Sequence, residues 1–406
     1  MVTPGSSDAE CIPGDLGIQT TEMTTFEDAK RNRSDTDLEV SFPGIPKRQK
    51  ATHGDDDGDQ GHGQGQAPRK LSPSDYTVGW ICALPIEMAA AKAMLDDVHD
   101  SLLTSAYDTN AYTMGNIGVH NIVIACLPAR QYGTNSAATV ASNMRRSFPS
   151  IHFGLMVGIG GGVPGRVDLR LGDVVVSDQV VQYDLGKTVQ DGHFERTGTL
   201  NKPPQALMTA VAKLQADHAL EPSRIPSILS EMLRKHTFMT RFTHPGTLQD
   251  RLFDGTYDHV LSMDSCELCD TSMLLNRPAR TSSDPKIHYG VIASGNQVMK
   301  HGRTRDQLAQ ELGVLCFEME AAGLMDIFPC LVVRGICDYS DSHKNKQWQE
   351  YAAATAAAYA KELLSVIPFN GFNGTPAVAV MSSDAGQYCL TPAWVVSRSP
   401  LSSRSP

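Results

Sequence analysis

The sequence predicts an α/β fold, a single domain with a largely parallel central sheet flanked by helices. Three observations predict it. Between residues 75 and 368, apolar runs of strand length alternate with stretches of helical periodicity, a pattern typical of strands joined by covering helices. Two of these strands run into clusters of glycine or polar residues, where open α/β sheets bind their ligands. Both ends of the chain, by contrast, lack a sustained apolar period.

The first half of the domain shows this alternation. Residues 76–84 form an apolar run of strand length, and a helix is expected directly after it because Pro85 suits a first helical turn. A second strand is expected at 120–127. It leads through a loop ending at Gly133 to Thr134, whose hydroxyl can cap a helix that runs to residue 146.

The second half continues the pattern around a less regular insertion. Strands are expected at 153–157, 173–182, 286–293 and 331–336, and helices at 305–312, 319–326 and 348–367. Residues 202–280 are less periodic, so we interpret them as an insertion within the domain, with helices at 204–215 and 226–233.

The two ends of the chain have a different composition. Residues 1–70 are rich in Gly, Asp, Ser and Pro and include the run GDDDGDQGHGQGQ at 54–66. Such a segment cannot bury enough apolar surface to offset the entropy of ordering. We therefore expect a disordered N-terminal region at 1–70 and a loose C-terminal tail at 369–406.

Composition excludes several classes of partner. The formal net charge of −10 leaves no basic face for a nucleic-acid polymer. No segment reaches the roughly 18 uninterrupted apolar residues of a membrane span, and no apolar leader is visible. We expect a cytoplasmic protein with a small-molecule partner; the PKRQK run at 46–50 leaves a nuclear location as the alternative.

The nine cysteines show no disulfide framework, which favours a reducing compartment. Cys266 and Cys269 have a spacing that zinc sites use in pairs, but no second CxxC or HxxxH accompanies them. Two plain thiols, and no metal site, are therefore expected.

The first candidate site segment is a glycine cluster after a strand. Residues 154–165 read GLMVGIGGGVPG, followed by LGDVVVS at 171–177. Glycines at 158, 160 and 161 would let backbone N–H groups approach a ligand. The same run also occurs in many ordinary turns, and it lacks the order of a dinucleotide fingerprint.

The second and third segments carry carboxylates. FEMEAAG at 317–323 places two acids two residues apart at a predicted helix start, so they are not expected to face the same way. A carboxylate there can accept hydrogen bonds from sugar hydroxyls, or it can simply complement the helix dipole. VVRGICDYSD at 332–341 places Asp338 at the carboxyl end of a strand, either as a proton donor or as a turn residue.

In this order, the three segments resemble the purine and uridine phosphorylase superfamily, and most closely its fungal-type branch. The resemblance covers residues 75–368 and implies a nucleoside phosphorylase-like fold that cleaves the bond between a purine and its sugar. It implies that Asp338 is the acid at purine N7, that Glu320 binds the ribose hydroxyls, that Met319 packs under the sugar and that Arg334 lies nearby.

The resemblance also assigns the base-binding segment and the nucleophile. Residues 294–299 (SGNQVM) would present Asn296, Val298 and Met299 to the base, although Val298 replaces the usual aromatic ring. Phosphorylases carry an arginine and a serine in the glycine segment to hold phosphate. This chain has Met156 and Ile159 at those positions.

Both anion ligands are therefore missing. ALPIE at 83–87 resembles the nucleosidase pattern in which the glutamate activates water, so Glu87 is the expected base. A solvated helix-start acid is the alternative reading of Glu87.

Hydrolysis of purine nucleosides or nucleotides, without a cofactor, is thus the expected reaction. A phosphorylase with phosphate as co-substrate and a nucleotide-sensing module without turnover are the alternatives. The sequence does not assign the group at the 5′ position of the sugar. Five cationic or titratable residues could bind phosphates there or form a solvated rim: Arg166, Arg170, His343, Lys344 and Lys346. From family habit we expect a homo-oligomer.

Overall fold

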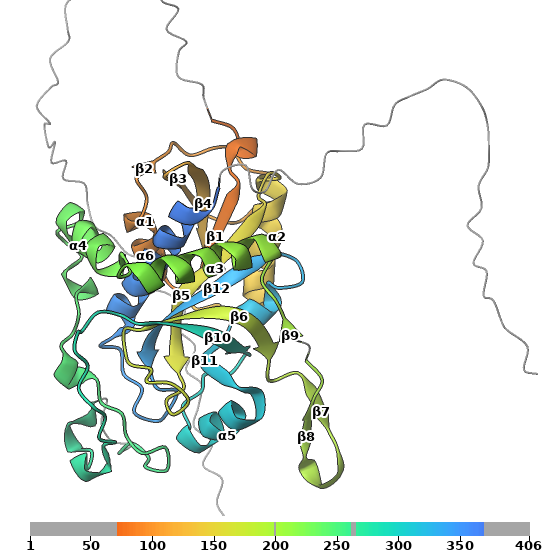
Figure 1. Ribbon diagram of the computed structural model, residues 1–406. Coiled ribbons are helices and arrows are strands. Elements are labelled where there is room, and N and C mark those ends of the chain that lie inside the picture. Colours follow the sequence, from red (N-terminus) through yellow and green to blue (C-terminus); the bar gives the residue numbers. More distant parts are fainter. Residues whose placement is uncertain (1–70, 199, 261–264, 369–406) are drawn as a thin grey trace, which may run out of the picture. The chain divides into compact units, whose positions relative to one another are not determined.

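The computed structural model describes residues 71–198, 200–260 and 265–368. The predicted disordered region at 1–70 and the predicted tail at 369–406 lie outside these residues. In the described part, strands and helices alternate and form one compact unit (Figure 1).

One large sheet runs through the domain, in the order β11-β10-β6-β12-β5-β1-β4-β3-β2, with β9 on the edge of β6. Two short strands, β7 and β8, form a separate hairpin. The strands are β1 (Val78–Cys82), β2 (Asp97–Val98), β3 (Tyr112–Ile117), β4 (His120–Cys126), β5 (Phe153–Gly162), β6 (Val174–Gln182), β7 (Gly186–Thr188), β8 (Phe194–Arg196), β9 (Leu200–Asn201), β10 (Ile287–Ser294), β11 (Val314–Glu318) and β12 (Cys330–Asp338).

The sheet is mixed, so the expectation of a largely parallel sheet is only partly correct. β5 is parallel to β1 and β12, and β10 is parallel to β6 and β11. β12, however, is antiparallel to β6, and the end of β5 pairs antiparallel with β11, which closes that half of the sheet into a barrel-like ring. β3 and β4 add a hairpin whose turn begins at Gly118, with φ of +55°.

Among the described residues, six α-helices cover the sheet, three of them close to their expected bounds. They are α1 (Pro85–Ala93), α2 (Thr134–Ser147), α3 (Gln205–Leu220), α4 (Ile225–Lys235), α5 (Gly302–Leu312) and α6 (Gln349–Val366). The helix expected at 319–326 is absent; only a 3-10 turn at Ala321–Gly323 forms there. The segment at 314–318, which the sequence pattern did not mark, is strand β11.

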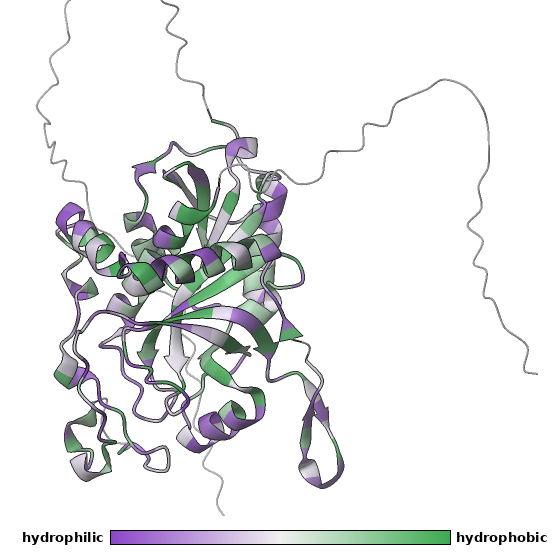
Figure 2. Cartoon of the chain, in the orientation of Figure 1, coloured by the Kyte–Doolittle hydropathy of each residue, from purple (hydrophilic) through white to green (hydrophobic). Residues whose placement is uncertain are grey.

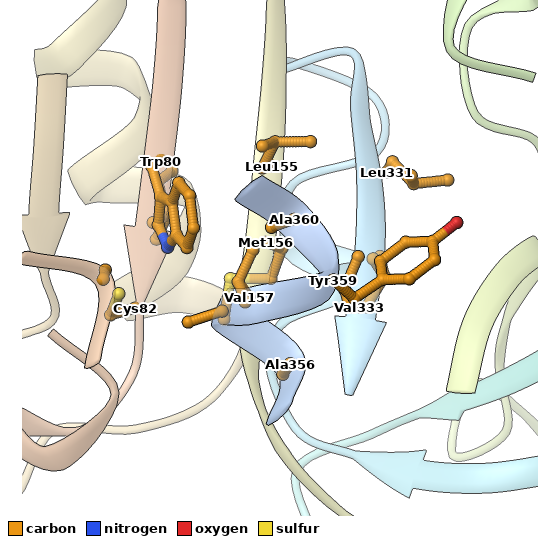
Figure 3. Close-up of a cluster of buried hydrophobic side chains, with 14 of the residues drawn as sticks. Trp80, Cys82, Leu155, Met156, Val157, Leu331, Val333, Ala356, Tyr359 and Ala360 are labelled. Atoms are coloured by element: carbon orange, nitrogen blue, oxygen red, sulfur yellow. The ribbon is translucent and has the colours of Figure 1, made fainter. Parts of the chain in front are cut away.

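The core lies where α6 crosses β5 and β12. Figure 3 shows Ala356, Tyr359 and Ala360 of α6 packed against Met156 and Val333 of the two strands. Alanines let the helix come very close: a Cβ on Gly335 would lie 1.8 Å from the Ala352 carbonyl oxygen. In Figure 2 the central strands are coloured as hydrophobic, whereas α5 and the β7–β8 hairpin are largely hydrophilic.

The segment after α4 has little regular structure but is tied to the domain. Arg277 donates to the Tyr339 hydroxyl over 2.7 Å, and that hydroxyl donates to Asp250. Trp348, at the start of α6, donates from its ring nitrogen to the Gln249 carbonyl. These contacts join the segment to the carboxyl end of β12. In the described part of the chain, no helix is long and apolar enough to cross a membrane.

Candidate active site

A cavity of about 340 Å³ opens where the ends of β5 and β11 meet the start of α1. Its lining combines carboxylates, glycines and half-buried apolar side chains. These residues are Ala83, Leu84, Glu87, Tyr132, Ile159, Gly160, Gly161, Gln297, Val298, Met299, Phe317, Glu318, Met319, Glu320, Cys337, Ser340, Lys344, Lys346 and Gln349. The cavity therefore contains most, but not all, of the site residues predicted from the sequence.

Glu87 lies in the first turn of α1 and is almost fully buried, with 3% of its surface exposed. One carboxylate oxygen accepts from the backbone N–H groups of Ala83 and Leu84, at 2.7 and 2.9 Å. The other accepts from Ile159 N–H on β5 at 2.8 Å. Burial raises the pKa of Glu87, and Arg334 opposes that shift. Glu87 is thus a buried carboxylate fixed against β5, and the alternative interpretation of Glu87 as a solvated helix-start acid is wrong.

The glycines of the cluster lie inside strand β5, and each makes room for a neighbouring group. A Cβ on Gly158 would lie 2.4 Å from Glu87, and one on Gly161 would lie 2.2 Å from the Ser340 hydroxyl and 2.8 Å from Asp338. A Cβ on Gly160 would lie 2.5 Å from the Cys316 sulfur. Gly158 and Gly161 let acidic side chains pack against the strand, and Gly160 and Gly161 also line the cavity.

Glu318 and Glu320 converge on one arginine. Arg334 Nη2 donates to Glu318 and lies 3.4 Å from Glu320 Oε2, and all three side chains are buried. The expectation that the two acids face different ways is therefore wrong. It assumed a helix from residue 319, whereas β11 ends at Glu318 and the chain turns tightly at Glu320.

The resulting cluster holds more carboxylates than cations. The pKa of Glu320 is raised to about 7, and burial is the largest cause. The charge of Arg334 lowers this pKa, whereas the charges of Glu318 and Glu87 raise it. Three carboxyls, two of them with a raised pKa, share the guanidinium of Arg334; Lys344 and Lys346 also line the cavity, so the negative potential is local to the carboxyls around Arg334. Such a site stabilises a positive charge that develops on a sugar.

The raised pKa of Glu320 predicts a pH-dependent stability. Folding favours the neutral carboxyl, so this contribution is complete below the ordinary value of 4.5 and is lost as pH rises through about 7. Glu320→Gln stays neutral throughout. We expect the Tm of this variant, relative to that of the wild type, to increase between those pH values. A Tm difference between Glu320→Gln and the wild type that does not change with pH would contradict the raised pKa of Glu320.

Asp338 lies at the end of β12, behind the cavity wall, and is 4% exposed. It borders an adjoining hollow of about 680 Å³ that shares Cys337 and Lys346 with the cavity. Its Oδ1 accepts from Ser340 N–H at 2.9 Å; its Oδ2 accepts from Cys337 Sγ at 3.0 Å and from Lys344 Nζ at 2.6 Å. This ion pair raises the pKa of Lys344 against the opposing effect of burial. Asp338 therefore has an ammonium proton donor beside it.

The predicted base-binding segment divides into two parts. Val298 and Met299 line the cavity, as does Met319 from the opposite side. Asn296 does not line it. Its side-chain oxygen accepts from the backbone N–H and hydroxyl of Thr134, both at 3.1 Å, and so holds the start of α2.

Of the five flanking residues that could meet phosphates, three do not line the cavity. Arg166 lies beside Gly313 at the end of α5, and Arg170 pairs with Asp168 at 2.9 Å. His343 is buried against Phe253, with ring centroids 4.1 Å apart. Lys344 and Lys346 line the cavity. Of these two, Lys346 alone has no ion-pair partner among the described residues.

Several residues of the cavity lining were not predicted from the sequence, among them Glu318, Tyr132 and Ser340. Glu318 was counted as facing away, and Tyr132 and Ser340 were not singled out. For Ser340 the sequence offered a signal, because it follows Asp338 by two residues; its uncommon positive φ of 56° is seen only in the structure. Tyr132 comes from the loop before α2 and reaches the cavity only through the tertiary fold.

The fold and the site define an α/β protein with a cavity in which buried carboxylates surround one arginine. The sequence profile of the phosphorylase superfamily matches residues 77–367, and the chain belongs to this superfamily.

Three relatives illustrate its range. A nucleotide-binding leucine-rich repeat (NLR)-like protein of Hyaloscypha variabilis is 48% identical over 73% of this chain and 30% of its own length. A 5′-methylthioadenosine/S-adenosylhomocysteine nucleosidase of Mycobacterium bovis is 25% identical over 72% of this chain and 97% of its own. The ATP nucleosidase Cap17 of Escherichia coli is 22% identical over 70% and 50%. The chain thus spans under a third of the first relative.

Proposed function

We propose that the chain hydrolyses the N-glycosidic bond of purine nucleosides or nucleotides. The observation that carries the proposal is the arrangement of Glu87 and Glu320 in one cavity, with Asp338 and its Lys344 partner at the wall. The matching nucleosidases named above support the same reaction class.

Glu320 acts on the sugar. Its carboxylate faces the cavity beside Met319 and can accept hydrogen bonds from both ribose hydroxyls. As the glycosidic bond stretches, the ring gains positive charge, and the excess negative potential of the carboxylates stabilises it. Arg334 keeps these carboxylates in place by bonding to Glu318 and Glu320.

Asp338 and Lys344 act on the leaving base. Departure of a purine requires a proton at a ring nitrogen, because the neutral base leaves far more readily than its anion. The Asp338 carboxylate takes a proton from the Lys344 ammonium, 2.6 Å away, and passes it to N7 as the bond to the sugar breaks. The lysine then recovers a proton from solvent, which balances the step.

Glu87 acts on water. Its carboxylate lines the cavity. Burial raises the pKa of Glu87 toward neutral pH, and a general base works best when its pKa lies near the pH at which it acts. The Ile159 N–H that could otherwise hold an anion donates to Glu87 instead. Together with the excess of carboxylates, this disfavours a phosphate dianion at the sugar and so favours hydrolysis over phosphorolysis.

Two features bear on the substrate. The base meets Val298 and Met299, and Tyr132 and Phe317 supply aromatic rings to the same cavity. Lys346, exposed at the mouth of the cavity, can meet phosphates at the 5′ position, which makes purine nucleotides substrates alongside nucleosides.

The experiment is a panel of purine nucleosides and nucleotides incubated with the full chain, with released base measured by chromatography and binding measured by calorimetry. We expect base release from at least one member, with Lys346→Met raising the KM for nucleotides more than for nucleosides. Binding without base release from any member would favour a sensing module instead.

A further inference from the structure

Outside the active-site cavity, the segment after α4 brings together three side chains of metal-binding type. His259, Cys266 and Cys269 each offer one ligand atom, and these atoms all lie within 4.8 Å of one another. Cys269 is buried and the other two are half-buried. The CxxC pair, which lacks a partner motif in the sequence, thus has beside it a histidine from seven residues earlier in the chain.

A fourth side chain of this type lies beside them. His343 is 6% exposed, and neither of its ring nitrogens has a hydrogen-bond partner among the described residues. Its ring centroid is 5.4 Å from that of His259, and its carbonyl oxygen is 3.9 Å from Cys266 Sγ. Its ring stacks on Phe253, and its Nδ1 lies 3.8 Å from Asp341 Oδ1, too far for a hydrogen bond, so a metal bond would satisfy one of its buried nitrogens.

We propose that His259, Cys266, Cys269 and His343 form a structural zinc site. Two thiolates and two neutral imidazoles are a ligand set that zinc takes in closed tetrahedral sites, and soft sulfur ligands disfavour calcium and magnesium. The bound set is electrically neutral, which suits its half-buried position. The four ligands come from two segments of the chain separated by more than seventy residues.

The position of the site gives it a consequence for the active site. The backbone N–H of His259 donates to the Ser342 hydroxyl at 2.9 Å, so this histidine is already bonded to the segment that follows β12. His343 directly precedes Lys344, which pairs with Asp338. Zinc would therefore fix the segment after α4 to the loop that carries Lys344, without contacting the substrate.

Metal content tests the proposal. We expect the full chain, purified without chelator, to contain stoichiometric zinc by mass spectrometry of the metal. Cys266→Ser and Cys269→Ser should each lose it. Cys126→Ser is the matched control because Cys126 is a half-buried free thiol on β4, and it should keep the zinc. Stoichiometric zinc in the Cys266→Ser, Cys269→Ser double variant would overturn the site.

A second measurement covers variants that fail to fold. Wild-type chain stripped with chelator should bind cobalt and show the absorption bands of a tetrahedral cobalt–thiolate centre, and zinc should restore its Tm. A chain that carries no zinc and shows no such bands overturns the proposal, as does a disulfide between Cys266 and Cys269 in the purified protein. If His343→Ala retains full zinc affinity, the assignment of His343 as fourth ligand is wrong.

Discussion

Asp338→Asn should lower turnover by about 10²- to 10⁴-fold while the protein stays folded and still binds substrate. The amide can accept from Ser340 N–H as the carboxylate does, but it cannot pass a proton to the base. It also ends the ion pair with Lys344, which leaves a partly buried ammonium without its carboxylate. The measurement is kcat for base release, together with Tm.

Two controls sharpen this prediction. Asp217→Asn, on the exposed face of α3, makes the same chemical change far from the cavity and should leave kcat unchanged. A purine analogue with carbon in place of N7 removes the destination of the proton, so the wild type should cleave it poorly. Cleavage of this analogue at the rate of the parent compound would show that the leaving group is activated elsewhere.

Glu87→Gln should lower turnover by roughly 10²-fold or more, with a smaller effect on substrate binding. The amide oxygen can still accept from Ala83 and Leu84, but the amide NH₂ then faces the Ile159 N–H, which has lost its acceptor. A moderate loss of Tm should therefore accompany the loss of rate.

The control is Glu231→Gln on the exposed surface of α4, where the glutamate pairs with Lys235. It should alter neither quantity measurably, because an exposed pair of this kind contributes little. If Glu87→Gln turned over substrate like the wild type, Glu87 would have a structural role at the start of α1 and water would be activated by another group.

The sequence was informative where function depends on chain order. Glu87 follows a buried strand and Asp338 ends another, so their positions relative to the strands predicted that both lie at one end of the sheet. Glu320 was predicted from the FEMEAAG segment, and it lines the cavity. The antiparallel pairings were not predictable in this way. β11 follows α5 directly, but its pairing with the end of β5 depends on the sheet closing on itself.

Contacts between distant segments were also beyond the sequence. The convergence of Glu318 and Glu320 on Arg334 follows from a tight turn where a helix was expected. Asn296 was expected at the base, but its side chain accepts from the N–H and hydroxyl of Thr134, the first residue of α2. His259 and His343 join the CxxC pair only after the segment following α4 packs against the loop after β12.

Hydrolysis by this cavity is the central claim, and the sugar product tests it most directly. Wild-type chain should release purine in buffer free of phosphate, with unphosphorylated sugar at C1 as the second product, and added phosphate should neither raise the rate nor change that product. A rate that vanishes without phosphate, together with sugar 1-phosphate when phosphate is present, would contradict the role of Glu87 and make the protein a phosphorylase.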